Sequence, residues 1–216
     1  MSKKYDIFLF DLDGTITDSA LGITNSVMYA LKKFGIEETD RTKLYKFIGP
    51  PLTESFEKFY GFTKEQSLDG VKYYREYYHD KGIYENRVYD GSEEVLKKIN
   101  EAGKQAIVAT SKPEKYAKII IDHFHLTQYF ACVAGMEMDG GRGTKAQVIT
   151  YALEKNDITD KSNVLMIGDR EHDVIGAHEN GLDCLGILYG FGSRKEFEEA
   201  GADYIRENVE DILQFV

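Results

Sequence analysis

Short apolar runs alternate with helical patterns over most of this chain. The runs are typical of buried strands and cover residues 7–10, 105–110, 129–135, 163–168, 184–188 and 202–205. Apolar spacing and end signals predict helices between them, over 92–103, 113–124, 144–156 and 170–181, the first of them capped by Ser92. Alternating strands and helices form βαβ units, so the pattern predicts an α/β fold with a Rossmann-like parallel sheet covered on both faces.

One region breaks this alternation. From about residue 20 to residue 82 the chain shows four consecutive helical stretches, 20–35, 40–49, 52–61 and 63–82, each ended by a glycine, and no apolar strand run. We therefore expect a core domain made of residues 1–16 and 84–216, with residues 17–83 inserted as a separate helical lobe. The crossings near 17–20 and 81–90 are the expected hinges.

Chemically active residues follow the predicted strands. The carboxyl ends of parallel strands meet along one edge of a sheet, where α/β proteins bind their ligands. Asp169 and Asp173 are four residues apart and are expected to share a helix face. The residues expected at this edge are Asp11 and Asp13 after the first strand, Thr110, Ser111 and Lys112 after the second, Lys145 at the start of the helix after the third, and Asp169 and Asp173 after the fourth.

Each of these residues also has an ordinary structural explanation. Asp13-Gly14 alone is a common turn, Asp169 alone could cap a helix, and most lysines like Lys145 are solvated. The ordinary explanation fails for the set, because all of its members fall at strand ends of one predicted sheet. The sequence therefore predicts a reaction centre there.

Composition limits the partners of such a centre. The chain has 216 residues, 27 Lys and Arg against 37 Asp and Glu, and a formal net charge of −10. An acidic surface disfavours a nucleic-acid polymer, and the apolar run near the N-terminus is too short to span a membrane. Cys132 and Cys184 have no metal-ligand spacing and indicate buried thiols. We expect a cytoplasmic monomer or dimer that acts on a small molecule.

Four motifs in this order resemble those of the haloacid dehalogenase superfamily. They are "DLDGT" at 11–15, Thr110, Lys145 and "GDREHD" at 168–173, and the helical insertion is similar to the C1 cap of that superfamily. The remainder resembles its phosphoglycolate phosphatase-like branch, and "GDREHDVIGA" looks closest to the 5′-nucleotidase-like members. Two features depart from the usual pattern: Ala146 stands where proline is frequent, and 170–172 replace small residues.

The resemblance implies specific roles. Asp11 would be the nucleophile that forms an aspartyl-phosphate, and Asp13 would protonate the leaving oxygen and then activate water. Mg²⁺ would be held by Asp11, Asp169 and the backbone carbonyl of Asp13, with Asp173 binding through water or orienting Lys145. Because a carbon–halogen bond breaks without a proton, an acid at Asp13 favours phosphate esters.

The phosphoryl group would be bound by Thr110 and Lys145, helped by the backbone N–H groups of Leu12, Asp13 and Ser111. Substrate choice would depend on the cap, chiefly on the turn containing Gly49 and Pro50. Lys112, Arg142 and Arg170 are further candidate cations for a substrate.

The sequence thus predicts a Mg²⁺-dependent phosphatase for a small phosphorylated metabolite, similar to phosphoglycolate phosphatases. A 5′-nucleotidase acting on nucleoside monophosphates and a sugar-phosphate mutase remain as alternatives, since both can be built on the same motifs. A non-catalytic binding protein that kept the fold is a third reading, which the intact motif set disfavours.

Overall fold

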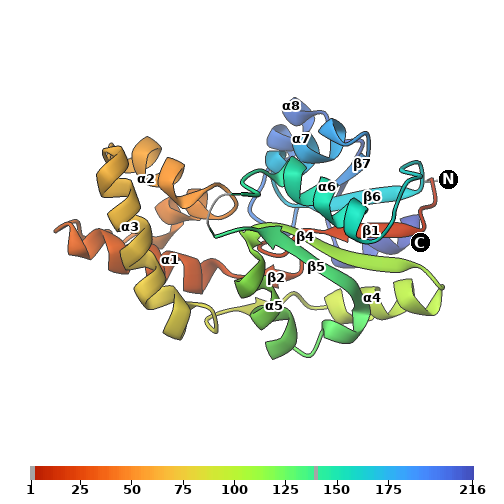
Figure 1. The fold of residues 1–216 in the computed structure, drawn as a ribbon, viewed down its shortest axis with the longest axis horizontal. Coiled ribbons are helices and arrows are strands. Elements are labelled where there is room, and N and C mark those ends of the chain that lie inside the picture. Colours follow the sequence, from red (N-terminus) through yellow and green to blue (C-terminus); the bar gives the residue numbers. More distant parts are fainter. Residues whose placement is uncertain (1–2, 139–140) are drawn as a thin grey trace. The chain divides into compact units, whose positions relative to one another are not determined.

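The core of the protein is a parallel sheet of six strands. The computed structural model describes residues 3–138 and 141–216. The sheet has the order β5-β4-β1-β6-β7-β8 and confirms the predicted α/β class (Figure 1). Its strands are β1 (Ile7–Phe10), β4 (Gln105–Pro113), β5 (Phe130–Met136), β6 (Val164–Gly168), β7 (Asp183–Ile187) and β8 (Tyr204–Arg206).

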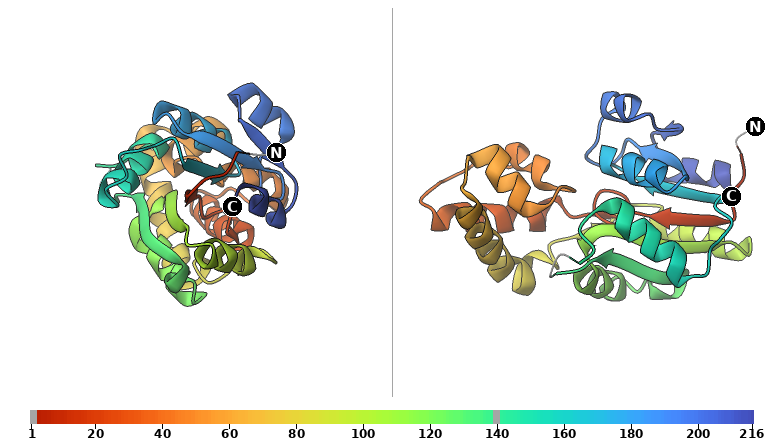
Figure 2. Two further views of the ribbon diagram at one scale, coloured as in Figure 1. Left: turned by 90° about the vertical axis from the view of Figure 1, so that its right-hand side faces the viewer. Right: turned by 45° about the horizontal axis from the view of Figure 1, so that its top comes forward.

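Helices cover both faces of this sheet (Figure 2). One face carries α6 (Lys145–Lys155), α7 (Glu171–Glu179) and α8 (Arg194–Ala200); the other carries α4 (Ser92–Glu101), α5 (Glu114–His123) and the 3₁₀ helix Val209–Phe215. Alternate strand residues face opposite layers, so Leu9 joins Ile107 and Met166 in the core under α6 and α7. These three side chains are fully buried, and each contributes roughly 1.5–3 kcal/mol of apolar burial.

A second compact unit is inserted after β1. One unit comprises the chain up to Thr17 together with Val88–Val216, and the other is Asp18–Arg87. A two-stranded ribbon of β2 (Thr17–Asp18) and β3 (Arg87–Val88) joins them. Within the second unit lie α1 (Ala20–Lys33), a 3₁₀ helix (Arg41–Phe47), α2 (Leu52–Tyr60), α3 (Lys64–Tyr77) and a π-helical turn (Tyr78–Gly82).

The second unit has a core of its own. Val27, Leu31, Phe47 and Phe56 are buried in it, and the rings of Phe47 and Phe56 pack edge to face with centroids 5.2 Å apart. An independent core is what allows an insertion of this size to fold as a unit. That this unit is a substrate-selecting cap stays a prediction.

Several predicted boundaries were wrong in detail. Ser92 is the first residue of α4 and not its cap; Gly91 takes the cap position with φ 87°, a conformation that glycine adopts without strain. Within the expected helix 40–49, residues Arg41–Phe47 form a 3₁₀ helix, and the end of the expected helix 63–82 widens into a π turn. Short 3₁₀ segments often serve as connectors and π turns occur as single turns in helices, so these differences leave the order of the elements unchanged.

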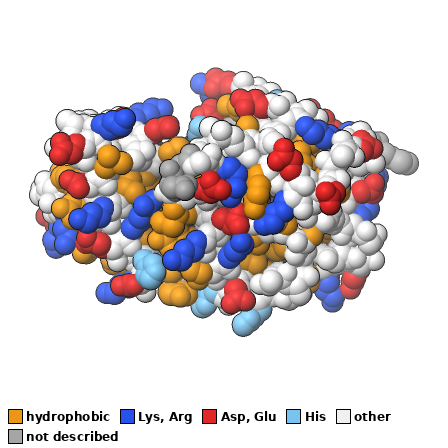
Figure 3. All heavy atoms as spheres, in the orientation of Figure 1, with side chains coloured by type: hydrophobic (Ala, Val, Ile, Leu, Met, Phe, Trp, Pro, Cys, Tyr) orange, Lys and Arg blue, Asp and Glu red, His pale blue; other side chains and the backbone are white. Residues whose placement is uncertain are grey.

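None of the helices in the described ranges is long and apolar enough to cross a bilayer. On the face shown in Figure 3, acidic and basic side chains are interspersed.

Candidate active site

The site is built first on the end of β1. The Asp11 N–H donates to the Ile167 carbonyl at 2.9 Å, so the strand pairing continues one residue past β1 and fixes the backbone of Asp11. The loop then folds back on itself, because the Leu12 carbonyl accepts from the N–H groups of Thr15, Ile16 and Thr17. The Asp11 residue is only 5% exposed. A rigid, buried strand end therefore presents this carboxylate.

Gly14 lets the same loop approach β6. Its φ is 85°, and a Cβ added there would lie 2.1 Å from Oδ2 of Asp169. Any side chain at this position would be both strained and in collision with the carboxylate. The glycine in "DLDGT" is thus required for the turn and for the contact between two strand ends.

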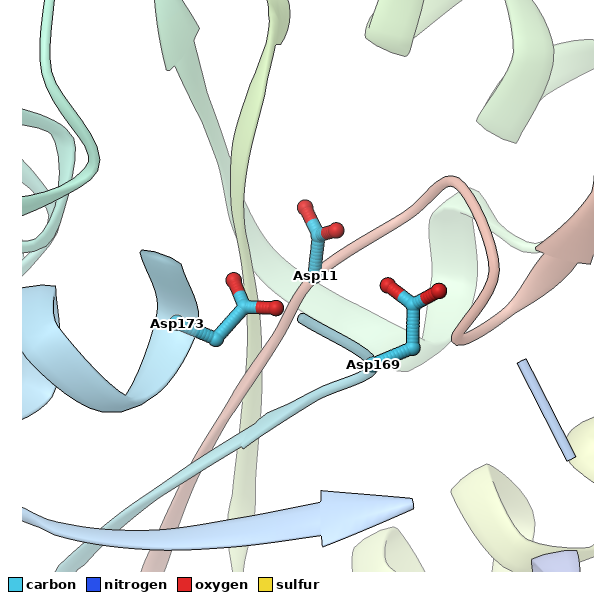
Figure 4. A group of neighbouring side chains, drawn as sticks. All are labelled: Asp11, Asp169 and Asp173. Carbon is cyan, nitrogen blue, oxygen red and sulfur yellow. The ribbon is translucent and has the colours of Figure 1, made fainter. Parts of the chain in front are cut away.

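Three aspartates from separate segments converge beside this loop. Asp11, Asp169 and Asp173 each offer a carboxylate oxygen, these oxygens lie within 4.8 Å of one another, and all three residues are buried (Figure 4). The predicted shared helix face was wrong, because α7 begins at Glu171 and Asp169 precedes it. The loop after β6 brings Asp169 to the cluster, whereas α7 carries Asp173.

Lys145 is the cation of this cluster. Its Nζ lies 2.7 Å from Oδ1 of Asp11, 2.7 Å from Oδ1 of Asp173 and 3.0 Å from the Ala109 carbonyl. Burial disfavours the ammonium, but the two carboxylates outweigh burial and raise the pKa of Lys145. As the first residue of α6, it also sits at the positive end of a helix, which makes the carboxylate partners necessary.

Asp169 is the least satisfied member of the cluster. Burial, followed by the charges of Asp11 and Asp173, raises its pKa well above the usual value. Oδ2 accepts from the Phe191 N–H at 2.8 Å, whereas Oδ1 is buried and accepts no hydrogen bond within the described ranges. Three buried carboxylates against one lysine leave excess negative charge, which a divalent cation with oxygen ligands would neutralise. The donor set therefore fits a metal ion of this type.

A glycine-rich loop after β7, which was not among the predicted site residues, supports Asp169. The loop is Tyr189–Gly192; the Tyr189 hydroxyl donates to the Thr15 carbonyl at 3.0 Å. A Cβ on Gly190 would lie 2.4 Å from Cβ of Asp169, so only glycine permits the loop to close over that side chain. The signal was available as "YGFG" at the carboxyl end of a predicted strand.

The predicted phosphate-binding residues lie after β1 and in the last part of its neighbour β4. The two strands pair in parallel, with Phe10 opposite Val108, so Leu12 and Asp13 follow the end of β1. The expected end of the second strand at residue 110 was wrong, because β4 continues to Pro113 and contains Thr110 and Ser111. The Thr110 side chain is buried, and its Oγ1 accepts from the Lys112 N–H at 3.2 Å.

The other candidate cations have protein partners. Arg142 is paired with Glu137 at 2.8 Å and Glu114 at 3.1 Å, and Arg170 donates to Glu196 at 2.9 Å. Lys112 forms a buried ion pair with Asp13. Gly49 and Pro50 lie in the unit 18–87, in the turn before α2. A role of these five residues in substrate binding stays a prediction.

Metal binding is expected to stabilise the protein in a pH-dependent way. A pKa that is raised on folding gives stability that is full below the unfolded value and is lost as pH rises, so metal-free protein should weaken towards pH 8. A divalent ion at about 100 times its Kd adds about 2.7 kcal/mol, or roughly 5–10 °C in Tm for a chain of this length. Thermal unfolding with MgCl₂ or EDTA at pH 5 and pH 8 should show the larger Mg²⁺ shift at pH 8.

Asp169→Asn is the matched variant for this measurement and should lose most of the Mg²⁺ shift. An equal shift at both pH values, or a full shift in the variant, would contradict binding by the aspartate cluster.

The fold and site together define an α/β enzyme in which a strand-end carboxylate lies beside a lysine in a buried aspartate cluster whose oxygens suit a metal ion. The chain belongs to the haloacid dehalogenase-like hydrolase family, whose sequence model matches residues 8–187. A solved structure of a predicted phosphatase from Clostridium acetobutylicum matches it with a TM-score of 0.94 and 47% identity, covering 98% of each chain. Among curated relatives, a 5′-nucleotidase of Pseudomonas aeruginosa is 45% identical over 193 residues, 89% of this chain and 87% of that protein.

Other relatives carry different names. A phosphoglycolate phosphatase of Vibrio parahaemolyticus is 22% identical over 97% of this chain and 95% of its own length. Tyrosine-protein kinase PtkA of Mycobacterium tuberculosis is 35% identical over 86% of this chain and 63% of that protein. The predicted family, and a phosphatase within it, are confirmed. The names of these relatives indicate different substrates, so the substrate of this chain is proposed below.

Proposed function

We propose that this chain is a Mg²⁺-dependent phosphatase that hydrolyses nucleoside 5′-monophosphates through an aspartyl-phosphate on Asp11. The observation that carries the phosphatase mechanism is the pairing of Asp11 with Lys145 at 2.7 Å beside Asp169 and Asp173, with Asp13 two residues further on. The nucleotide substrate is supported by the 45% identity to a 5′-nucleotidase, against 22% to a phosphoglycolate phosphatase.

In the first step an Asp11 oxygen attacks phosphorus, and the bond from phosphorus to the ester oxygen breaks. The electron pair of that bond goes to the ester oxygen, which takes a proton from Asp13. Lys145 and Thr110 bind the phosphoryl oxygens and stabilise the charge on them. When bound by Asp11 and Asp169, Mg²⁺ would supply positive charge that reduces the repulsion between carboxylate and phosphate.

In the second step water attacks phosphorus of the aspartyl-phosphate. Asp13, now ionised, accepts the proton of that water, and the bond from phosphorus to the Asp11 oxygen breaks. The products are inorganic phosphate, the Asp11 carboxylate and protonated Asp13, so both side chains return to their starting state.

The proposal assigns substrate choice to the helical region 17–83, including Gly49 and Pro50. The aspartate cluster, Thr110 and Lys145 all belong to the other unit and provide chemistry for the phosphoryl group alone. The group beyond the phosphate must then be distinguished by residues outside this set.

We also propose a cytoplasmic setting. Cys132 and Cys184 are free thiols, which suits a reducing compartment.

Purified protein with Mg²⁺ is expected to release phosphate from nucleoside 5′-monophosphates with kcat/KM about 10-fold or more above that for phosphoglycolate. A hydrophobic or polar pocket matched to one leaving group gives discrimination of roughly this size or larger. A colorimetric phosphate assay over a panel of monoesters, with Mg²⁺ and with chelator, measures it; Asp11→Asn protein from the same preparation controls for contaminants.

Three results would redirect the proposal. Preference for phosphoglycolate would change the substrate and keep the mechanism. Isomerisation of a sugar phosphate without net phosphate release would indicate a mutase, and transfer from ATP to a protein tyrosine would indicate a kinase. No phosphate from any ester would remove the proposed function.

A further inference from the structure

A buried lysine holds the residue that we assign as the general acid. Nζ of Lys112 lies 2.7 Å from Oδ2 of Asp13, and the two side chains are 5% and 11% exposed. Burying an ammonium is costly unless a partner of opposite charge compensates. The pair therefore fixes the Asp13 carboxylate through one oxygen.

The other oxygen of Asp13 has different surroundings. Oδ1 is buried and accepts no hydrogen bond from any group in the described part of the chain. A buried carboxylate oxygen without a donor costs free energy and calls for an explanation. A reacting group that exchanges a proton with substrate provides one, because the partner of such an oxygen is the substrate or water and not a donor of the protein.

The backbone of β4 places Lys112 for this contact. Lys112 lies two residues after Thr110, and its N–H donates to Oγ1 of Thr110 at 3.2 Å. The register of β4 against β5 shifts between Thr110 and Pro113. Irregularities of this kind bend a strand and re-aim its side chains, often beside active sites.

We propose that Lys112 is a positioning residue that holds Asp13 by Oδ2 and so commits Oδ1 to the proton transfer. The inference rests on the proposed function. In the first step the proton on Oδ1 passes to the ester oxygen as the bond to phosphorus breaks, and in the second Oδ1 takes a proton from the attacking water. Lys112 keeps its own protons throughout.

The alternative, a cation for a second anionic group of the substrate, requires Lys112 to leave Asp13. The two roles differ in which kinetic constant they control. A substrate anchor lowers KM for substrates with a second charge, whereas a positioning residue acts on any ester whose leaving group needs a proton.

The test compares phenyl phosphate with p-nitrophenyl phosphate, which are alike in size and charge. Nitrophenolate leaves without taking up a proton, whereas phenolate has to be protonated as it leaves. Lys112→Met should lower kcat/KM for phenyl phosphate roughly 10²-fold, the lower end of general-acid contributions, and lower that for p-nitrophenyl phosphate by no more than about 3-fold. Because kcat/KM covers only steps through departure of the leaving group, slow hydrolysis of the phosphoenzyme does not mask the difference.

Three variants make the result specific. Lys112→Arg should restore part of the phenyl phosphate activity, and Lys115→Met, at an exposed position three residues on, should leave both constants unchanged. In an Asp13→Asn background Lys112→Met should cost no further kcat/KM for either ester, because the two residues act as a unit. Activity of the two single variants and the double variant on p-nitrophenyl phosphate shows that each of them is folded, so this comparison also controls for a loss of fold.

An equal loss for both esters, a change in KM alone, or a further loss in the Asp13→Asn background would overturn the role of Lys112. These outcomes require active wild-type protein. Absence of Mg²⁺-dependent hydrolysis in the wild type would instead overturn the proposed function.

Discussion

Asp11→Asn is expected to abolish hydrolysis of every phosphate monoester that the wild-type chain turns over. An amide is not a nucleophile towards phosphorus, and the change also removes one ligand of the proposed metal site. We expect kcat/KM to fall roughly 10⁴-fold or more, in line with the loss of a covalent nucleophile in other enzymes. Acid-quenched samples of wild-type protein should contain a phosphorylated intermediate by intact mass, and the variant should contain none.

Two variants accompany this measurement. Asp122→Asn removes an exposed aspartate at the end of α5 and should keep wild-type activity. Asp11→Ala excludes slow conversion of asparagine back to aspartate. If either Asp11 variant kept a tenth of the wild-type activity or formed the phosphoenzyme, Asp11 would not be the nucleophile.

The order of the elements was predictable from the chain because each strand carries a dense apolar signal. "IFLF" at 7–10 and "NVLMIG" at 163–168 lie at the centre of the sheet, where both faces are covered, and such strands are apolar throughout. The α/β class follows from the alternation of these apolar runs with helical patterns. Helix ends were less predictable: Ser92 was expected to cap α4, but it is the first helical residue and Gly91 takes the cap position.

The acidic members of the site were predictable for a topological reason. Asp11 and Asp169 follow neighbouring parallel strands, so the sheet brings them together whatever the intervening sequence does. Partners set by side-chain packing were not predictable in this way. The ion pair between Lys112 and Asp13 is such a contact, whereas the predicted role of Lys112 in substrate binding stays a prediction.

The contacts of the glycine-rich loop Tyr189–Gly192 with Asp169 were not predictable for the same reason, although the "YGFG" sequence itself marked the loop. Its contacts to Asp169 join a loop after β7 to a loop after β6, and their geometry depends on how closely two backbones approach. No spacing rule in a single sequence gives that distance.

Lys145→Met is expected to separate the contribution of Lys145 to the stability of the protein from its contribution to catalysis. Its ammonium lies 2.7 Å from both Asp11 and Asp173, all with buried side chains, and removing one partner of a buried ion pair costs about 3–5 kcal/mol. Metal-free Lys145→Met should therefore unfold at clearly lower urea concentration than wild type. Its deficit should grow as pH rises, because the pKa of Asp173 is already raised by burial and its nearest cation is lost.

Mg²⁺ should restore much of this stability, since a divalent cation supplies the missing charge to the same carboxylates. It should not restore catalysis, because a metal ion held by Asp11 and Asp169 cannot take the place of Nζ beside the phosphoryl oxygens. We expect kcat/KM to stay roughly 10²–10³-fold below wild type, the cost of removing one preorganised charge donor.

Urea unfolding in EDTA and in MgCl₂, paired with phosphate release in MgCl₂, measures both effects on one protein. Lys155→Met removes an exposed lysine from the other end of α6 and should change neither. Wild-type stability of Lys145→Met in EDTA would show that the ion pairs do not hold the cluster, and recovery of activity with Mg²⁺ would show that Lys145 serves only to balance charge. Stability rescued without activity would instead assign Lys145 two separable roles, one as counterion of the carboxylates and one as ligand of the phosphoryl group.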